Sequence, residues 1–256
     1  MTPPTDPFNS VATELDTWRR AGKTARLWLR DDDAMTTTGA LERLLGLTAT
    51  HHVPLLLAVI PMRAEQELAR RLEHEKLVEV AMHGAWHRNN APAGRKGEEM
   101  APERGVPAIA ADLKEARERL LDLFGTSAGG WYVPPWNRIA PEVAALLPSI
   151  GFGALSTFGT QHLTVRGLQV RNCQVDLIDW RGGRVGRKPE WVAEQLAAAL
   201  ANARANGFGA VGILTHHLDH DEITWSVLES LLALVATHPG ASWIAISGDL
   251  PHAPQD

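Results

Sequence analysis

Short apolar runs alternate along this chain with longer amphipathic runs, and this alternation limits the fold more than any other feature. The short runs, typical of buried strands, are 25–30, 53–60, 77–82, 130–133, 153–156, 168–178, 210–214 and 242–246. The runs with helical spacing are 39–50, 65–76, 109–124, 141–147, 189–206 and 223–237. Repeated strand–helix alternation predicts a mostly parallel sheet. At 256 residues we expect one α/β domain over 1–256, a distorted (β/α) barrel of about seven strands.

Two segments lie outside this alternation. Residues 1–24 precede the first strand, and we treat them as an N-terminal extension. Residues 89–107 are rich in proline, glycine and charge, and the strand–helix pattern resumes after them. A loop of this length inside a domain is usually functional, so we expect 89–107 to act as a lid.

Composition excludes several classes of partner. The net charge is −5 and no basic stripe is present, which argues against nucleic acid. No run approaches the ~18 apolar residues of a membrane span, and no signal peptide is visible. The single cysteine, Cys173, is typical of a reducing compartment. We therefore expect a cytoplasmic protein that acts on a small molecule or a glycan, in an oligomeric state that the sequence does not define.

Polar residues able to bind metal follow several of the predicted strands. The metal-competent residues are Asp31–Asp33, His83 and His87, Asp176 and Asp179, and His216–His217, and Pro135–Asn137 and Trp180 follow strands in the same way. In a parallel α/β barrel these strand ends face the side where active sites are built. The sequence therefore predicts an active site that gathers these residues.

The spacing of His83 and His87 favours a metal site. Two imidazoles four residues apart can bind one ion, and Gly84 after the first excludes the zinc-protease motif, which has Glu there. The three consecutive aspartates Asp31–Asp33 repel one another at a buried strand end, and a divalent cation would neutralise them. Their side chains alternate in direction, so they cannot share one role. Asp33 fits a solvated turn before the next helix as well as it fits the site.

Other catalytic classes find no support in the sequence. There is no G-x-S-x-G elbow for a serine hydrolase and no G-x-G-x-x-G for a dinucleotide. Cys173 lies in the middle of a strand run and favours packing over nucleophilic catalysis. His216 ends the strand at 210–214, where a histidine suits general acid catalysis.

Five segments together resemble the motifs of a known family. They are LRDDDA at Leu29–Ala34, HGAWH at His83–His87, VPPWN at Val133–Asn137, DLIDW at Asp176–Trp180 and ILTH at Ile213–His216. In this order, from about Ala25 to Ile246, they resemble the polysaccharide deacetylase superfamily, also called the NodB homology domain or carbohydrate esterase family four. The resemblance implies a metal-dependent hydrolase that removes an acyl group, in the first place acetyl, from a sugar-like amide.

The resemblance also implies roles for individual residues. Asp31 would be the catalytic base, and Asp32, His83 and His87 would hold one divalent metal, with zinc first and cobalt, nickel or iron as alternatives. His216 would assist the leaving group. The substrate-binding residues would be Pro135, Trp136, Trp180 and Trp86.

Departures from the motifs leave a second function open. Val133 stands where the third motif has an arginine that orients the base, and Arg30 or Arg138 are the candidates to replace it, with Asp179 and His217 as further support. Gly84 replaces a serine or threonine. These differences indicate a divergent intracellular branch, and the alternative function is a catalytically impaired member that binds a glycan or a metal. A barrel amidohydrolase is disfavoured, because that class has His-x-His on its first strand.

Overall fold

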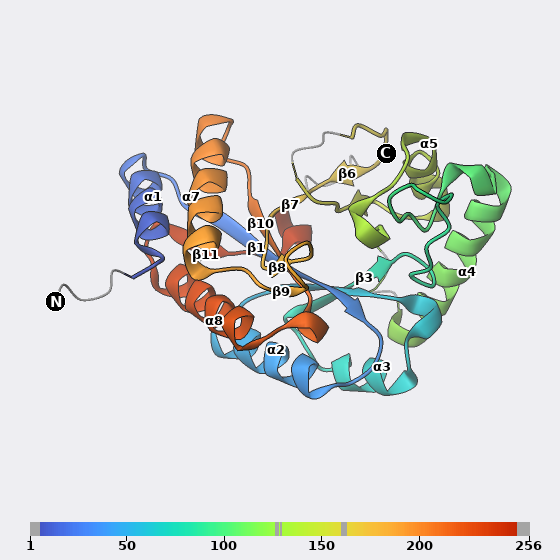
Figure 1. The fold of residues 1–256 in the computed structure, drawn as a ribbon, viewed down its shortest axis with the longest axis horizontal. Coiled ribbons are helices and arrows are strands. Elements are labelled where there is room, and N and C mark those ends of the chain that lie inside the picture. The colour runs from blue at the N-terminus through green and yellow to red at the C-terminus, as the bar shows by residue number, and fades with distance from the viewer. Residues whose placement is uncertain (1–5, 126–127, 129, 160–162, 250–256) are drawn as a thin grey trace. The chain divides into compact units, whose positions relative to one another are not determined.

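The apolar runs of the sequence form the strands of a mostly parallel sheet (Figure 1). The computed structural model describes residues 6–125, 128, 130–159 and 163–249. The chain folds into two compact units. The first unit is drawn from Met1–Arg30, Gly39–Leu55 and Gln174–Asp256, and the second from Asp31–Thr38 and Leu56–Cys173.

Eleven strands are present in the described part of the chain. They are β1 Ala25–Ala34, β2 Leu55–Val59, β3 Val78–His83, β4 Trp131–Val133, β5 Ala154–Leu155, β6 Gln169–Val170, β7 Cys173–Asp176, β8 Ile178–Asp179, β9 Val185–Gly186, β10 Val211–Thr215 and β11 Ala241–Trp243. The α/β class is as predicted, but the strands outnumber the expected seven. One reason is that the single run 168–178 is broken into β6, β7 and β8.

The helices agree with the amphipathic runs, except that the run 141–147 is divided between two short helices and one helix is additional. They are α1 Asn9–Arg20, α2 Gly39–Thr50, α3 Gln66–Leu72, α4 Val106–Phe124, α5 Pro141–Ala144, α6 Leu147–Ile150, α7 Pro189–Ala205 and α8 Glu222–Thr237. The addition is α1, which lies in the segment treated as an extension. Among the described residues, no helix combines the length and the apolar character that a membrane crossing requires.

The second unit contains one half of the sheet. Its strands follow the order β6-β5-β4-β3-β2, and the last residues of β1 come next to β2. The pairs β3–β4, β4–β5 and β5–β6 are parallel. β2 is buried along its whole length, as expected for a parallel strand covered on both faces. The register of β3 and β4 places His83 opposite Val133, and both strands end there.

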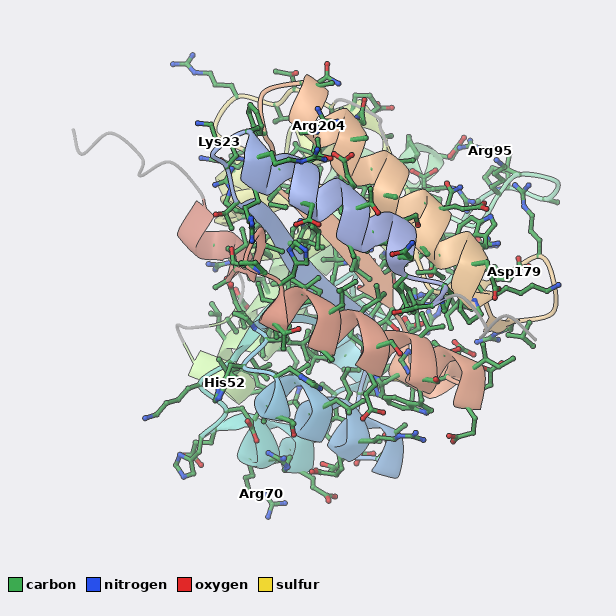
Figure 2. All side chains as sticks on the ribbon, turned by 90° about the vertical axis from the view of Figure 1, so that its left-hand side faces the viewer. Lys23, His52, Arg70, Arg95, Asp179 and Arg204 are labelled. Atoms are coloured by element: carbon green, nitrogen blue, oxygen red, sulfur yellow. The ribbon has the colours of Figure 1, made fainter. Side chains whose placement is uncertain are left out.

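The first unit contains the start of β1, which pairs with β11 in parallel and is followed in the sheet by β10 and β7. Helix α1 packs on α7. Its buried residues are Val11, Leu15 and Trp18, whose spacing of four and then three residues places them on one face of the helix. The Trp18 Nε1–H donates to the carbonyl of Leu200 at 3.2 Å. Figure 2 shows Arg204 of α7 where it passes α1, and its Nε lies 2.7 Å from Glu14 Oε1.

The loop at 89–107 is only partly open to solvent. It contains a 3-10 turn at Pro102–Arg104 and leads into α4 at Val106. Residues 92–96 are exposed, whereas 98–101 are buried. The middle of the predicted lid, 98–101, is therefore packed into the unit, whereas 102–107 are again partly or fully exposed.

Candidate metal centre

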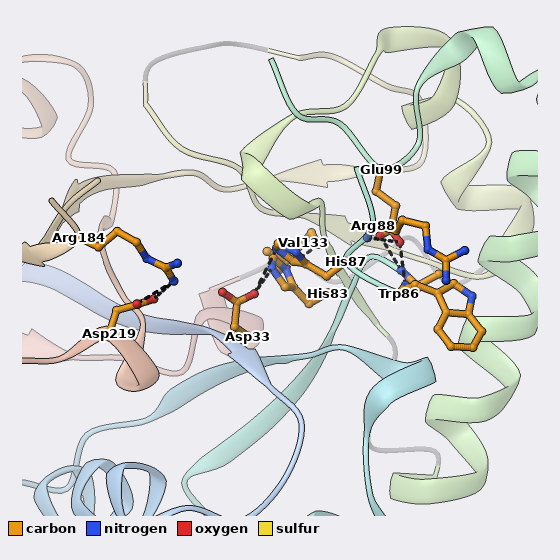
Figure 3. A network of polar contacts seen from close by, with 10 residues as sticks. Asp33, His83, Trp86, His87, Arg88, Glu99, Val133, Arg184 and Asp219 are labelled. Atoms are coloured by element: carbon orange, nitrogen blue, oxygen red, sulfur yellow. Dashed lines mark hydrogen bonds and ion pairs between the residues drawn. The ribbon is translucent and has the colours of Figure 1, made fainter. Parts of the chain in front are cut away.

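Three side chains of the second unit bring potential metal-ligand atoms together. Asp33 Oδ1 lies 3.1 Å from His83 Nε2 and 3.3 Å from His87 Nε2 (Figure 3). One ligand atom from each of the three residues lies within 4.8 Å of the other two. Within the described ranges, no other His, Cys, Asp or Glu side chains form such a group of three. The pairing of His83 with His87 agrees with the sequence prediction of a two-histidine site.

A tight turn after β3 brings the two imidazoles together. Gly84 has a φ of +60° and His87 a φ of +54°, so the chain reverses within four residues. Only glycine adopts the left-handed region without cost, and a Cβ at Gly84 would overlap the Pro135 ring and the Glu99 carboxylate. As a result the His83 and His87 rings lie 5.2 Å apart, measured between centroids.

The sheet register orients the His83 ring. Its Nδ1 lies 3.0 Å from the carbonyl oxygen of Val133, a distance at which the ring nitrogen donates its proton to that oxygen. The same carbonyl also accepts from the backbone N–H of Gly84 at 3.1 Å. A proton held on Nδ1 leaves the lone pair of Nε2 directed at Asp33, and this backbone contact is typical of metal-binding histidines. Val133 thus contributes to the site through its backbone.

His87 is held in its neutral form. Burial lowers the pKa of His87, and the charge of Asp33 opposes this effect only in part. The ring also packs against Trp136, with centroids 4.5 Å apart. Neutral imidazole is the form that binds metal, so the environment of His87 favours coordination over protonation.

The three residues fit a divalent cation. Ligands about 2.0–2.1 Å from one tetrahedral ion lie about 3.3 Å from one another, close to the separations of Asp33 from the two histidines. The Nε2 lone pair of a neutral histidine repels a carboxylate oxygen at such a distance, and a cation between them removes this repulsion. Two imidazoles and one carboxylate suit zinc and also iron, cobalt and nickel.

The carboxylate in this group is Asp33, whereas the motif resemblance pointed to Asp32. Asp32 and Asp31 are both buried, and neither belongs to the group of ligand atoms in the described chain. Asp33 has a φ of +74°, outside the strand region. The backbone therefore departs from regular alternation at this residue, and strand periodicity alone did not identify the aspartate that faces the histidines.

Glu99, a residue that sequence reasoning missed, supports the turn. It lies in the 89–107 loop and its side chain accepts three backbone hydrogen bonds (Figure 3). The donors are the N–H groups of Ala85, Trp86 and Arg88. The one sequence signal is weak: two adjacent glutamates stand before the apolar pair Met100–Ala101 in a loop that otherwise has the composition of a solvated segment.

The VPPWN segment packs beside the histidines and the loop. Pro135 is buried, and Trp136 has a φ of +55° within a short 3-10 turn that presents its ring to His87. Arg138 donates from Nη1 to the carbonyl oxygen of Gly97 at 2.7 Å, so it ties the loop to this segment. Arg30, the other candidate to replace the missing arginine, is fully buried.

Trp86, proposed from the sequence as a substrate-binding residue, lies on the outer side of the turn. It is 40% exposed, and the guanidinium of Arg88 lies over its ring, 5.5 Å from the centroid. Figure 3 shows the ring pointing away from the rings of His83 and His87. Its substrate-binding role stays a prediction.

In the first unit, His216 directly follows β10 and packs against Trp180. The two rings meet edge to face with centroids 4.6 Å apart. Trp180 Nε1 donates to Asp176 Oδ2 at 2.8 Å, and Asp176 Oδ1 accepts from the Ile178 N–H at 3.0 Å. His216 is buried, whereas Trp180 leaves 39% of its surface exposed. Asp176 thus orients an aromatic face that is accessible to a ligand.

Asp179 and His217, the residues expected to give further support, lie in the same unit. Asp179 accepts from the Gly182 N–H at 3.1 Å and pairs with Arg187 at 3.5 Å, so it organises the β8–β9 hairpin. His217 is buried. Asp219 lies two residues further on and pairs with Arg184 at 2.8 Å (Figure 3).

Comparison with solved structures gives a similarity of fold. The sequence matches no protein-family model and no curated protein. A solved structure from Mycobacterium smegmatis, assigned to the polysaccharide deacetylases, is similar with a TM-score of 0.67 at 20% identity, over 89% of each chain. A family 4 carbohydrate esterase from Streptomyces lividans in complex with acetate gives 0.58 at 14% identity, over 88% of this chain and 94% of that one. A family 4 acetyl xylan esterase from Clostridium thermocellum, in complex with cobalt, gives 0.53 at 14% identity, over 87% and 89%.

These identities are low and the coverage is nearly complete, so the comparison concerns the fold. It confirms the fold class that the five motifs predicted, an α/β sheet of the distorted-barrel type. The chain has the fold of the polysaccharide deacetylases.

Proposed function

We propose that this protein is a metal-dependent hydrolase that removes an acyl group, in the first place acetyl, from a sugar-like amide. The observation that carries the proposal is the group formed by Asp33, His83 and His87. Its support is the fold, which this chain shares with deacetylases and esterases of acetylated carbohydrates.

The proposed ligands are Asp33 and the Nε2 atoms of His83 and His87, which leave further positions open for water and substrate. A divalent cation held by these residues would polarise the acyl oxygen and would lower the pKa of water toward neutrality. Zinc is the first candidate, and cobalt, nickel and iron suit the same ligands. Val133 contributes by holding His83 in the tautomer that offers Nε2.

Placing the metal on Asp33 changes the proposed base. The family motif has two consecutive aspartates, of which the first is the base and the second the ligand. If Asp33 is the second, the first is Asp32, and Asp31 occupies the position before the pair. We propose that the Asp32 carboxylate accepts a proton from the attacking water, and that Asp31 remains the competing assignment.

The leaving group and the sugar need further residues. The motif resemblance gives His216 the role of donating a proton to the departing amine, and the buried position of its ring beside Trp180 supports a functional role. Trp180 offers an exposed aromatic face suited to stacking on a sugar ring. Pro135 and Trp136 are proposed to shape the side of the site next to His87.

Turnover of acetylated sugars tests the proposal. Zinc-loaded and cobalt-loaded protein would be incubated with oligomers of N-acetylglucosamine and with O-acetylated xylan oligomers, and released acetate measured. We expect acetate from the N-acetyl substrates, and none after chelation or from Asp33→Asn. Metal-loaded protein that releases no acetate from either would contradict the proposal. It would favour the alternative function, a glycan-binding or metal-binding protein without turnover, which the replacement of the motif arginine by Val133 leaves open.

A further inference from the structure

The side chain of Glu99 is enclosed by the turn that joins the two metal-binding histidines. Glu99 is 2% exposed. Its Oε2 accepts from the Ala85 N–H at 2.9 Å, and its Oε1 accepts from Trp86 at 2.7 Å and from Arg88 at 3.2 Å. Three of the five backbone N–H groups from Gly84 to Arg88 therefore converge on one carboxylate.

This convergence follows from the backbone of the turn. Gly84 and His87 both lie in the left-handed region, and a chain that reverses in this way points successive N–H groups into one concavity. Such a concavity favours an anion. Without Glu99, these part-buried or buried N–H groups would lack their partner, at a cost of about 1–3 kcal/mol for each one left unsatisfied.

The backbone that carries Glu99 is itself held in place. Its carbonyl accepts from Asn90 Nδ2 at 2.8 Å, and the side-chain oxygen of Asn89 accepts from the N–H of Glu98 at 3.1 Å. Two residues before Glu99, the carbonyl of Gly97 accepts from Arg138. The carboxylate thus reaches the turn from a fastened segment, which differs from a lid that opens.

We propose that Glu99 is a positioning residue for the metal centre: it clamps the Gly84–Arg88 turn so that His83 and His87 present their Nε2 atoms to the same point as Asp33. The inference rests on the proposed function, since it concerns the same three ligands. Glu99 bonds to none of the ligand side chains in this role and acts through the backbone between them. The 89–107 loop then serves as a clamp for the site.

This role differs from a contribution to stability alone. A merely structural glutamate would change the free energy of unfolding and leave metal affinity unchanged in the folded protein. A positioning residue changes the affinity and the coordination geometry, because without it the metal itself must order the ligands when it binds. Replacement of groups that orient metal ligands typically weakens metal binding about 10–100-fold.

The test compares Glu99→Ala, Glu99→Gln and the control Glu103→Gln. Glu103 lies on the same loop, is half exposed and pairs with Arg95. Zinc affinity would be measured by competition with a chromophoric chelator, coordination by the visible absorption of the cobalt-loaded protein, and folding by circular dichroism and thermal unfolding of the metal-free protein.

We expect zinc affinity to fall about 10–100-fold in Glu99→Ala, with an altered cobalt spectrum. Glu99→Gln should lie between this variant and wild type, because it keeps one acceptor oxygen, and Glu103→Gln should match wild type. A folded Glu99→Ala protein with wild-type affinity and spectrum would overturn the inference. If Glu99→Ala does not fold, Glu99→Gln decides by the same two readouts. Wild-type protein that binds no metal would instead overturn the proposed function, and the inference with it.

Discussion

The carboxylate of Glu99 occupies the space that a side chain at Gly84 would need. A Cβ on Gly84 would overlap this carboxylate and the ring of Pro135. The φ of Gly84 adds a second barrier to any other residue. We therefore predict that Gly84→Ala lowers the free energy of unfolding through left-handed strain of about 1–2 kcal/mol. Overlap should add about 1–3 kcal/mol more. Urea unfolding of the metal-free protein measures the sum.

Gly94 provides the control for this prediction. It also has a positive φ, of +82°, but a Cβ there would meet nothing within 4 Å. Gly94→Ala should therefore show the strain alone. Equal losses in the two variants would mean that the Gly84 site has room for a side chain, and that Glu99 does not fill it.

The proposed shift of the base from Asp31 to Asp32 gives a second prediction. Asp32→Asn keeps the size of the side chain and the three proposed ligands, so zinc should still bind while acetate release falls about 10²–10⁴-fold, the usual contribution of a general base. The rate of acetate release should fall much less in Asp31→Asn. The reverse pattern would restore Asp31 as the base, and parallel single-turnover assays with measured zinc content distinguish the two.

Much of the fold was predictable because its signals are local. Runs such as Leu55–Val59 and helices such as Val106–Phe124 carry continuous apolar character or helical spacing, and both appear where they were expected. Helix α1 was missed although Val11, Leu15 and Trp18 have helical spacing. The short strands β5 and β6 depend on their neighbours in the sheet, so the sequence indicates them only roughly.

The grouping of candidate site residues was predictable where it depends on motif spacing and not where it depends on tertiary geometry. His83 and His87 were identified because four residues separate them and a strand precedes them. Asp33 was left undecided because its positive φ redirects the carboxylate, and no periodicity shows this. Glu99 could not be predicted because the backbone groups that it accepts from lie 11 to 14 residues away in sequence, and only the fold of the loop brings them together.

His220 gives the first unit a predicted sensitivity to acid. Burial lowers its pKa to about 3, helped by His217, His216 and Arg43 and opposed by Asp221. Its ring also packs edge-on against Trp225, 4.2 Å away, and its Nε2 meets Thr215 Oγ1. Below pH 6.5 the unfolded chain protonates this histidine while the folded chain does not, until pH nears 3. Stability should therefore fall as the pH is lowered through this window.

The predicted size is about 2 kcal/mol between pH 7 and pH 5, at 1.36 kcal/mol for each pH unit below the unfolded pKa. His220→Gln removes the titrating group, so its free energy of unfolding should decline by about that much less over the same interval. Urea unfolding at both pH values provides the comparison, since all other groups are shared. Identical declines would show that His220 is not kept neutral by the fold.

We propose that Asp33, His83 and His87 hold one divalent metal, and the metal content of the purified protein shows whether they do. Wild type, Asp33→Asn, Asp32→Asn and His83→Ala would be loaded with zinc, desalted and analysed by elemental mass spectrometry. We expect about one zinc per chain in wild type and in Asp32→Asn, and its loss from Asp33→Asn and His83→Ala. Stoichiometric zinc in Asp33→Asn with loss from Asp32→Asn, or no zinc in the wild-type protein, would contradict it.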